Sequence, residues 1–375
     1  MPSSRYGSAP KERLQHAASL INNAKQCVLF LGADSSTPEN AEAIRALLKI
    51  KPFPVVSTYQ AAGVISKELL KYFIGRVGLF KNQPGDEILD VADLVITVGF
   101  NTVEYDPEIW NAKNKKQIIH LDYNPCYVHN TYQPACELLG DIAENLETLA
   151  PLLEKNKRGN ALEKITENHT KLLREIEAGK QFNGTPIHPL RFIYELSQVV
   201  DDEMTVCCDI GSVYMWMARY FLSYRPRQVL FSNGQQTLGV GLPWAMGCNY
   251  ARPGKKVISI SGDGGFLFSA AELETAVREK LHLVHFIWRD GAYNMVLEQE
   301  LMKYKRKSGV DLGRVNILDF AKAFGAVGFE LTDPSQFQAL FKEAINCDKP
   351  VLIDVPIDYS HNHALFESID PHSGN

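Results

Sequence analysis

Short apolar runs rich in β-branched residues alternate along the chain with segments of helical periodicity. In the first half, the runs that end in Gly, Asp or Ser cover residues 27–32, 54–57, 93–99 and 117–122. In the second half, similar runs cover residues 205–209, 256–261, 283–288 and 350–355. Nearly continuous apolar runs separated by helices are typical of parallel strands buried on both faces. The pattern therefore predicts an α/β protein with two doubly wound parallel sheets.

The chain changes character between residues 141 and 180, where Glu, Lys, Leu and Asn dominate and strand formers are rare. Ile142, Leu146 and Leu149 repeat with helical spacing, which predicts a terminal helix followed by a connecting segment. We therefore expect three parts. They are a central, Rossmann-type domain over residues 1–160, a linker over 161–182 and a second domain over 183–375.

Composition narrows the class of protein. Hydrophobic residues make up 45% and charged residues 22% of the chain, without a long biased block, so a disordered or fibrous protein is excluded. The formal net charge of −5 gives no electrostatic reason to bind nucleic acid. No apolar run resembles a signal sequence or is long enough to span a membrane. We expect a cytoplasmic protein that acts on small molecules, without a nucleic acid or membrane partner.

One loop in the second half carries candidate chemistry. The predicted strand that ends at Ser261 runs directly into Gly262, Asp263, Gly264 and Gly265, and we expect a helix to begin near Ser269 with Glu272 in its first turn. Glycines let the backbone approach an anion, and a carboxylate can reach a diphosphate through a divalent cation. A tight turn that only needs glycine would look the same.

A second oxygen ligand strengthens the interpretation as a cation site. Asp290 follows the next predicted strand, and the spacer after Gly264 is long enough for one helix and one returning strand. The carboxyl ends of neighbouring parallel strands meet at one edge of a sheet, where open α/β sheets bind ligands. The two carboxylates could therefore share Mg²⁺, with the backbone carbonyl of Ala292 as a third ligand.

These motifs resemble those of thiamin-diphosphate enzymes. A GDG sequence, a spacer of this length and an Asn or Asp is similar to their metal–diphosphate motif. Residues 232–247, 261–278 and 293–296 are similar to acetolactate synthases, in particular the catabolic branch that lacks flavin. The resemblance extends from about residue 10 to 360. It implies a central domain followed by the domain that binds the cofactor diphosphate.

The resemblance also implies a role for each matching residue. The Mg²⁺ ligands would be Asp263, Asp290 and the carbonyl of Ala292. The residues around the diphosphate would be Gly211, Ser212, Gly262, Gly264, Gly265, Tyr293 and Asn294. Leu238 would wedge between the two rings of the cofactor, and the carbonyl of Gly239 would accept a hydrogen bond from the pyrimidine amino group. The remaining residues expected near the cofactor are Gln236, Met295 and Val296.

The activity implied by the resemblance is the joining of two pyruvates to 2-acetolactate with loss of CO₂, in acetoin and butanediol formation. Its cofactors would be thiamin diphosphate and Mg²⁺. Residues 76–85 resemble the flavin-free branch, so no FAD is expected. Family members carry active sites between subunits, which implies a homo-oligomer for the complete enzyme.

Two departures from the family pattern affect these expectations. Related synthases commonly carry a histidine after Gly211, where this chain has Tyr214 nearby, so the substrate pocket or its hydrogen bonds would differ. No segment matches the pyrimidine-binding domain, which carries the general acid/base glutamate. We therefore expect no catalytic residue in this chain, little activity from it alone, and a pyrimidine domain supplied in cis or in trans.

Other interpretations remain open from the sequence. The chain could belong to another thiamin-diphosphate 2-oxo acid decarboxylase, or be a non-catalytic assembly protein that keeps the cofactor fold. His188, His282 and His285 have no acidic partner nearby in sequence, which favours structural roles. The basic residues 303–307 form either a lid that attracts anions or a solvated helix face.

Overall fold

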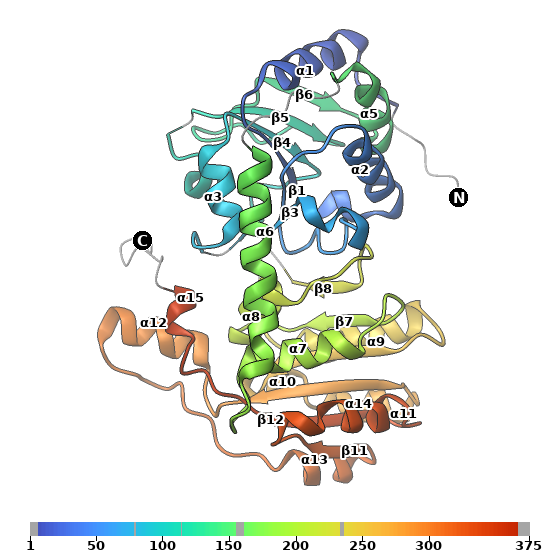
Figure 1. The fold of residues 1–375 in the computed structure, drawn as a ribbon. Coiled ribbons are helices and arrows are strands. Elements are labelled where there is room, and N and C mark those ends of the chain that lie inside the picture. The colour runs from blue at the N-terminus through green and yellow to red at the C-terminus, as the bar shows by residue number, and fades with distance from the viewer. Residues whose placement is uncertain (1–6, 79, 114, 155–160, 233–235, 367–375) are drawn as a thin grey trace. The chain divides into compact units, whose positions relative to one another are not determined.

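The computed structural model describes residues 7–78, 80–113, 115–154, 161–232 and 236–366 (Figure 1). Two compact units make up the chain: residues 1–173 with 223–227, and residues 174–222 with 228–375. The expected boundaries at 160/161 and 182/183 stay predictions. Parts of those expected ranges (1–6, 155–160 and 367–375) and residues 233–235 of one motif segment lie outside the described residues.

The first unit contains a parallel sheet of six strands in the order β3-β2-β1-β4-β5-β6. These strands are β1 Cys27–Leu31, β2 Val55–Ser57, β3 Phe73–Arg76, β4 Leu94–Val98, β5 Gln117–Asp122 and β6 Cys136–Leu139. The sequence predicted β1, β2, β4 and β5, and the two further strands are the edges.

Helices cover both faces of this sheet, as a doubly wound fold requires. One face is covered by α1 Lys11–Asn23, α2 Pro38–Ile50 and α5 Ile142–Leu149 (Figure 1). The other face is covered by α3 Pro84–Val91, with the short α4 Pro107–Trp110 against it. The core beneath α3 and α4 is aromatic, because Phe30 packs 4.7 Å from Phe100 and edge-on to Trp110 at 5.7 Å between ring centroids.

The segment expected to connect the domains is largely helical. After the 3₁₀ turn Ala150–Leu152, helix α6 spans Ala161–Ala178 and leads into a second 3₁₀ turn, Gly179–Gln181. Further 3₁₀ turns cover Ala33–Ser36, Lys67–Tyr72 and Pro334–Gln336.

The second unit contains another six-stranded parallel sheet, in the order β11-β12-β10-β9-β7-β8. Its strands are β7 Thr205–Cys208, β8 Val229–Phe231, β9 Val257–Gly262, β10 Leu283–Arg289, β11 Val327–Glu330 and β12 Val351–Pro356. Again the four inner strands were predicted from the apolar runs and the two edges were not. The expected class, two doubly wound parallel sheets, is confirmed.

Helices again divide between the two faces of the sheet. One face is covered by α9 Gly241–Ala251, α10 Asp263–Ser269, α11 Glu272–Arg278 and α13 Ile317–Phe324. The opposite face is covered by α7 Pro189–Val199, α8 Ser212–Tyr220 and α14 Phe337–Ile345. Two more helices, α12 Asn294–Tyr304 and α15 His363–Phe366, follow β10 and β12.

The helix after the glycine-rich loop begins earlier than the sequence suggested. It starts at Asp263 rather than near Ser269, while Glu272 does lie in the first turn of a helix, α11. A side chain at Gly264 would lie 2.6 Å from the ring of Tyr293, so the glycine inside α10 is required by packing. Close packing therefore outweighs the low helix propensity of glycine here.

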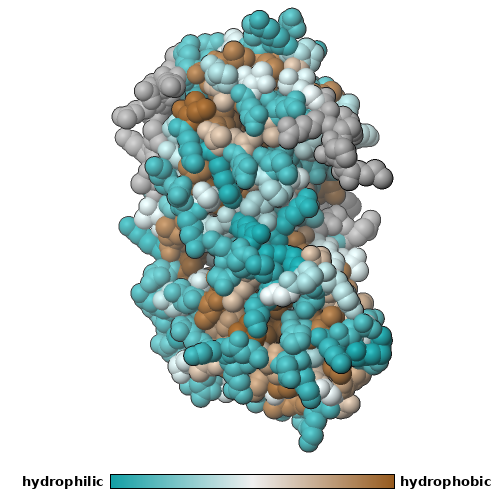
Figure 2. Space-filling view, turned by 90° about the vertical axis from the view of Figure 1, so that its right-hand side faces the viewer, coloured by the Kyte–Doolittle hydropathy of each residue, from teal (hydrophilic) through white to brown (hydrophobic). Residues whose placement is uncertain are grey.

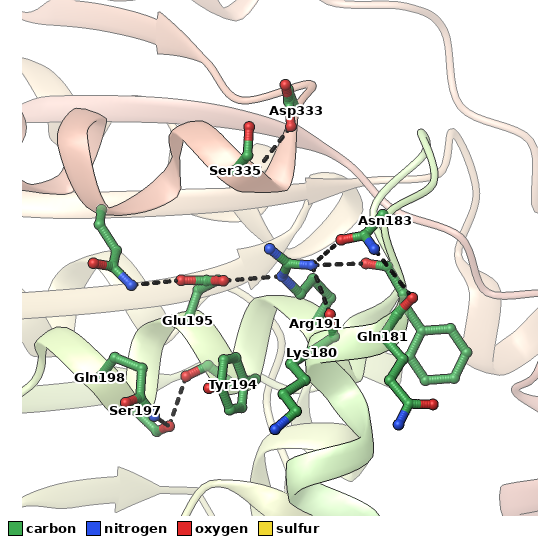
Figure 3. Close-up of polar contacts among 12 residues, drawn as sticks. Lys180, Gln181, Asn183, Arg191, Tyr194, Glu195, Ser197, Gln198, Asp333 and Ser335 are labelled. Atoms are coloured by element: carbon green, nitrogen blue, oxygen red, sulfur yellow. Dashed lines mark hydrogen bonds and ion pairs between the residues drawn. The ribbon is translucent and has the colours of Figure 1, made fainter.

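A buried ion pair ties α7 to its neighbours in the second unit (Figure 3). The Arg191 Nε donates to the Glu195 Oε1 at 2.9 Å, and the second oxygen of Glu195 accepts from the Gln338 side chain of α14, also at 2.9 Å. The Arg191 guanidinium also donates to the carbonyl of Lys180 at 3.0 Å and to the Asn183 side chain. These bonds satisfy both buried charges and fix the turn that enters α7.

The surface is dominated by polar side chains. Figure 2 shows hydrophilic residues over most of the visible face, with small hydrophobic patches between them. Among the described residues, no helix combines the length and the apolar character that a membrane crossing needs.

His285 occupies a structural position in β10, as expected. Its two ring nitrogens lie 2.7 and 2.9 Å from the hydroxyls of Ser259 and Ser261 on β9, and the side chain is fully buried. Burial lowers the pKa of His285 to about 3, so the folded protein keeps this ring neutral.

Acid should therefore destabilise the fold through His285. Below the ordinary pKa of 6.5, His285 binds a proton in the unfolded chain but stays neutral in the folded chain. The free energy of unfolding therefore falls by up to about 1.4 kcal/mol per pH unit as the pH drops from 6.5 towards 3. Between pH 6.5 and 4.5, the free energy of unfolding measured with denaturant should fall less in His285→Gln than in the wild type. His282 is exposed, so His282→Gln is the control and should show the same pH dependence of stability as the wild type. The same pH dependence in the wild type and both variants would contradict the assignment of the acid effect to His285.

Candidate active site

The largest group of predicted site residues lies where the strand order of the second sheet reverses, between β7 and β9. Parallel sheets bind ligands at such switch points, beyond the carboxyl ends of the strands. A cavity of about 300 Å³ opens there, which is at the lower end of the range for small-molecule sites. Its walls come from the loops after β7, β9 and β10, together with the 236–238 loop, α12 and one residue after β12.

The cavity brings together nearly all the residues singled out in the sequence. The predicted residues that line it are Gly211, Ser212, Gln236, Leu238, Gly262, Asp263, Gly264, Gly265, Asp290, Ala292, Tyr293, Asn294, Met295 and Val296. Gly239 is buried just outside this lining. Four further lining residues were not predicted: Ile210, Val213, Gln299 and Tyr359. What each residue does towards a cofactor stays a prediction.

Asp263 and Asp290 lie at the ends of the paired strands β9 and β10. Asp263 accepts backbone hydrogen bonds from Gly264 at 2.9 Å and from Gly291 at 2.8 Å. Burial raises the pKa of Asp263, and those N–H groups oppose the rise. Burial and the charge of Asp263 raise the pKa of Asp290 to about 7, with an opposing hydrogen bond from the Asn294 side chain. Two carboxylates that disfavour each other's charge in one buried site suit a divalent cation.

The protein offers few ligands of its own for such a cation. The described residues contain no cluster of three His, Cys, Asp or Glu side chains arranged around a metal position. Mg²⁺ prefers six oxygen ligands and usually keeps waters and phosphate oxygens among them. The donor set of two carboxylates and a nearby carbonyl therefore fits Mg²⁺ only when a phosphorylated ligand completes it.

Asp209, at the end of β7, holds the loop that carries Leu238 and Gly239. Its Oδ1 accepts from the Gly239 amide at 3.0 Å and from the Ile210 amide at 2.7 Å, and the amides of Val240 and Gly241 also donate to the carboxylate. The residue is fully buried, and the apolar run of β7 gave no sign of this role. Asp209 therefore sets where Leu238 enters the cavity.

Other candidate residues lie outside the cavity. Tyr214, which was expected to alter the substrate pocket, is buried edge-on against Phe231 at 5.6 Å between ring centroids and does not line the cavity. His188 accepts from the Leu190 amide as the N-cap of α7, a structural role like that of His285. The residues from Lys303 to Lys307 are exposed, and Lys307 pairs with Asp311 at 2.7 Å. These observations favour the solvated-face interpretation of the basic segment.

A glycine pair gives a direct test of the loop geometry. Gly239 has φ +84°, and a side chain there would lie 2.6 Å from the Cβ of Phe268, whereas a side chain at Gly247 in α9 would meet nothing within 4 Å. Gly239→Ala should lower the free energy of unfolding by about 1–3 kcal/mol through backbone strain. Gly247→Ala should raise it by about 0.5–1 kcal/mol. Thermal unfolding measures both, and a Gly239→Ala protein as stable as the wild type would disprove the left-handed turn at this position.

Comparisons with known proteins give matches for both units of the chain. The family profile "Thiamine pyrophosphate enzyme, C-terminal TPP binding domain" matches residues 209–355, and "Thiamine pyrophosphate enzyme, central domain" matches residues 14–149. Acetolactate synthase of Bacillus subtilis is 44% identical over 96% of this chain and 63% of its own length. The catabolic acetolactate synthase of Raoultella terrigena is 40% identical over 97% of this chain and 66% of its own length.

The match extends to more distant relatives. A probable acetolactate synthase large subunit of Methanococcus aeolicus is 30% identical over 93% of this chain and 61% of its own length. This chain thus spans less than two thirds of the length of these curated relatives. Both of its units match consecutive domains of one family, and the candidate cavity falls within the domain that binds thiamine pyrophosphate. The chain therefore contains a central domain and a TPP-binding domain of the thiamine pyrophosphate enzyme family.

Proposed function

We propose that this chain forms the central and cofactor-binding parts of an acetolactate synthase, which joins two pyruvates to 2-acetolactate and releases CO₂. The observation that carries the proposal is a cavity at the switch point of the sheet, which collects Asp263, Asp290 and the glycine-rich residues 262–265. The names of the most similar relatives support the choice of reaction.

In this proposal the cavity holds thiamin diphosphate through Mg²⁺. Asp263, Asp290 and the carbonyl of Ala292 are the protein's ligands for the cation, and Asp290 binds in its ionised form. Gly262, Gly264, Gly265, Gly211, Ser212, Tyr293 and Asn294 surround the diphosphate. The bound cofactor would supply the electron sink that a 2-oxo acid needs to lose CO₂.

The loop after residue 235 orients the cofactor in the same proposal. Leu238 lines the cavity as an apolar wedge, and Asp209 fixes the backbone that follows it by hydrogen bonds to the amides of residues 239–241. The carbonyl of Gly239 accepts from the amino group of the pyrimidine ring, while Gln236, Met295 and Val296 contact the rest of the cofactor. A rigid wedge supports reaction because orientation is set before substrate arrives.

The complete enzyme needs a pyrimidine-binding domain, supplied in cis or in trans, and acts as a homo-oligomer in the cytoplasm. That domain contributes the glutamate that moves a proton on the pyrimidine ring, so the described cavity provides binding and positioning rather than the acid/base group. The absence of a flavin remains part of the proposal, because residues 76–85 resemble the flavin-free branch.

Removal of one carboxylate should abolish the linkage between Mg²⁺ and cofactor binding. At a cofactor concentration about 100 times the Kd, binding adds about 2.7 kcal/mol of stability. We expect Asp263→Asn to lose this gain, since the cation loses a ligand, while the exposed Asp348→Asn keeps it. Thermal unfolding with thiamin diphosphate, with and without Mg²⁺, measures the gain. An unchanged shift in Asp263→Asn would overturn the metal site.

The reaction itself is tested by adding a pyrimidine-binding domain from a full-length acetolactate synthase to this chain. Pyruvate, Mg²⁺ and thiamin diphosphate should then give 2-acetolactate, with at least tenfold less product when Asp263→Asn replaces the wild type. Acetaldehyde in place of acetolactate would identify a simple 2-oxo acid decarboxylase. No product despite Mg²⁺-dependent cofactor binding would favour a non-catalytic assembly protein.

A further inference from the structure

A series of side-chain hydrogen bonds links Trp216, through Asn362 and Asn294, to the candidate metal site at Asp290. Asn362, which is fully buried after β12, accepts from the Trp216 Nε1 at 2.6 Å and donates to the Asn294 Oδ1 at 2.6 Å. Ser212 donates to the same Oδ1 at 2.7 Å. The Asn294 side chain in turn hydrogen-bonds to Asp290. Three segments that are far apart in the sequence, α8, α12 and the turn after β12, thus meet at the side-chain amide of Asn294.

Trp216 determines which atom donates and which accepts in each bond of this series. The indole N–H of Trp216 can only donate, so the atom of Asn362 that faces it must be the amide oxygen. The amide nitrogen of Asn362 then points to Asn294 and requires an acceptor there, which is the Asn294 oxygen. Trp216 therefore fixes the orientation of two amides whose oxygen and nitrogen atoms are otherwise similar in shape.

The fixed orientation presents donors to the candidate metal site. Because Ser212 and Asn362 both donate to the Asn294 oxygen, the Asn294 nitrogen is left to face the carboxylate of Asp290, which as an anion can only accept. The reverse orientation would aim the Asn294 oxygen at the carboxylate and repel it.

The segment after β12 is tied to the cavity at a second point. The backbone amide of Asn362 donates to the carbonyl of Tyr359 at 2.9 Å, and Tyr359 lines the cavity. Asn362 is fully buried, and its backbone amide, side-chain oxygen and side-chain nitrogen are all hydrogen-bonded. Its side chain therefore has a single arrangement. The residue is therefore rigid enough to control its neighbour.

We propose that Asn362 is a positioning residue of the cofactor site, which locks the Asn294 amide so that its N–H groups face Asp290 and the cavity. The inference rests on the proposed function, because Asp290 and Asn294 act there on Mg²⁺ and the diphosphate. Asn362 does not line the cavity and works through Asn294.

The test separates the positioning role from a structural one. In Asn362→Asp the oxygen that accepts from Trp216 is kept, but the donor to Asn294 is lost, so Asn294 turns its nitrogen to residue 362 and its oxygen to Asp290. We expect thiamin diphosphate at saturating Mg²⁺ to bind at least tenfold more weakly, as measured by calorimetry. Trp216→Phe frees both amides to reverse and should weaken binding by a smaller factor, about threefold.

Ser360→Ala is the matched control, because this exposed residue lies in the same turn and should leave the Kd and the melting temperature unchanged. Wild-type affinity in Asn362→Asp, with the wild type itself binding, would overturn the inference and leave the proposed function standing. If Asn362→Asp fails to fold, wild-type affinity in Trp216→Phe overturns it. A wild-type chain without Mg²⁺-dependent binding would refute the proposed cofactor site, and the inference with it.

Discussion

The candidate site of the second unit depends on two half-buried carboxylates, Asp263 and Asp290, at the ends of the paired strands β9 and β10. Burial raises the pKa of both carboxyls, and the charge of Asp263 raises that of Asp290 further. The backbone N–H groups of Gly264 and Gly291 donate to Asp263, and the Asn294 side chain donates to Asp290. Gly264 also lets Tyr293 pack against the start of α10, where a side chain would lie 2.6 Å from the tyrosine ring. The net effect is still a raised pKa at both carboxyls, to about 7 at Asp290, so the proposed cation would stabilise their ionised forms.

Strands were predictable from sequence where both faces of a sheet are covered. The inner strands of each sheet are nearly continuous apolar runs, because side chains on either face are buried. The four missed strands, β3, β6, β8 and β11, are the sheet edges, and their short sequences include Arg76, Glu137 and Glu330. The edge strands β6 and β11 have partly exposed side chains, so their composition carries a weaker signal. The edge strands β3 and β8 are mostly buried, but they have only four and three residues.

The site was predictable for a related reason, since most of its residues directly follow inner strands. Asp263 and Asp290 are adjacent in space because β9 and β10 are adjacent in the sheet. Asp209, Tyr359 and Asn362 were missed for different reasons. Asp209 continues an apolar run, and the other two act from the end of the chain, where only the folded structure reveals that the segment after β12 returns to the cavity.

Strand register links the cofactor site to the core of its sheet. Trp288 pairs with Gly262, so the residues that follow on β9 and β10 leave the sheet at the same level. A slip of one residue would turn every side chain of β10 to the opposite face, exchanging buried Phe286 and Trp288 with their neighbours and carrying Asp290 away from Asp263. The proposed cation site and the hydrophobic core therefore both depend on the pairing of β9 with β10. Substitutions in the loops that follow these strands leave this pairing unchanged, so they can alter the site without disturbing the core.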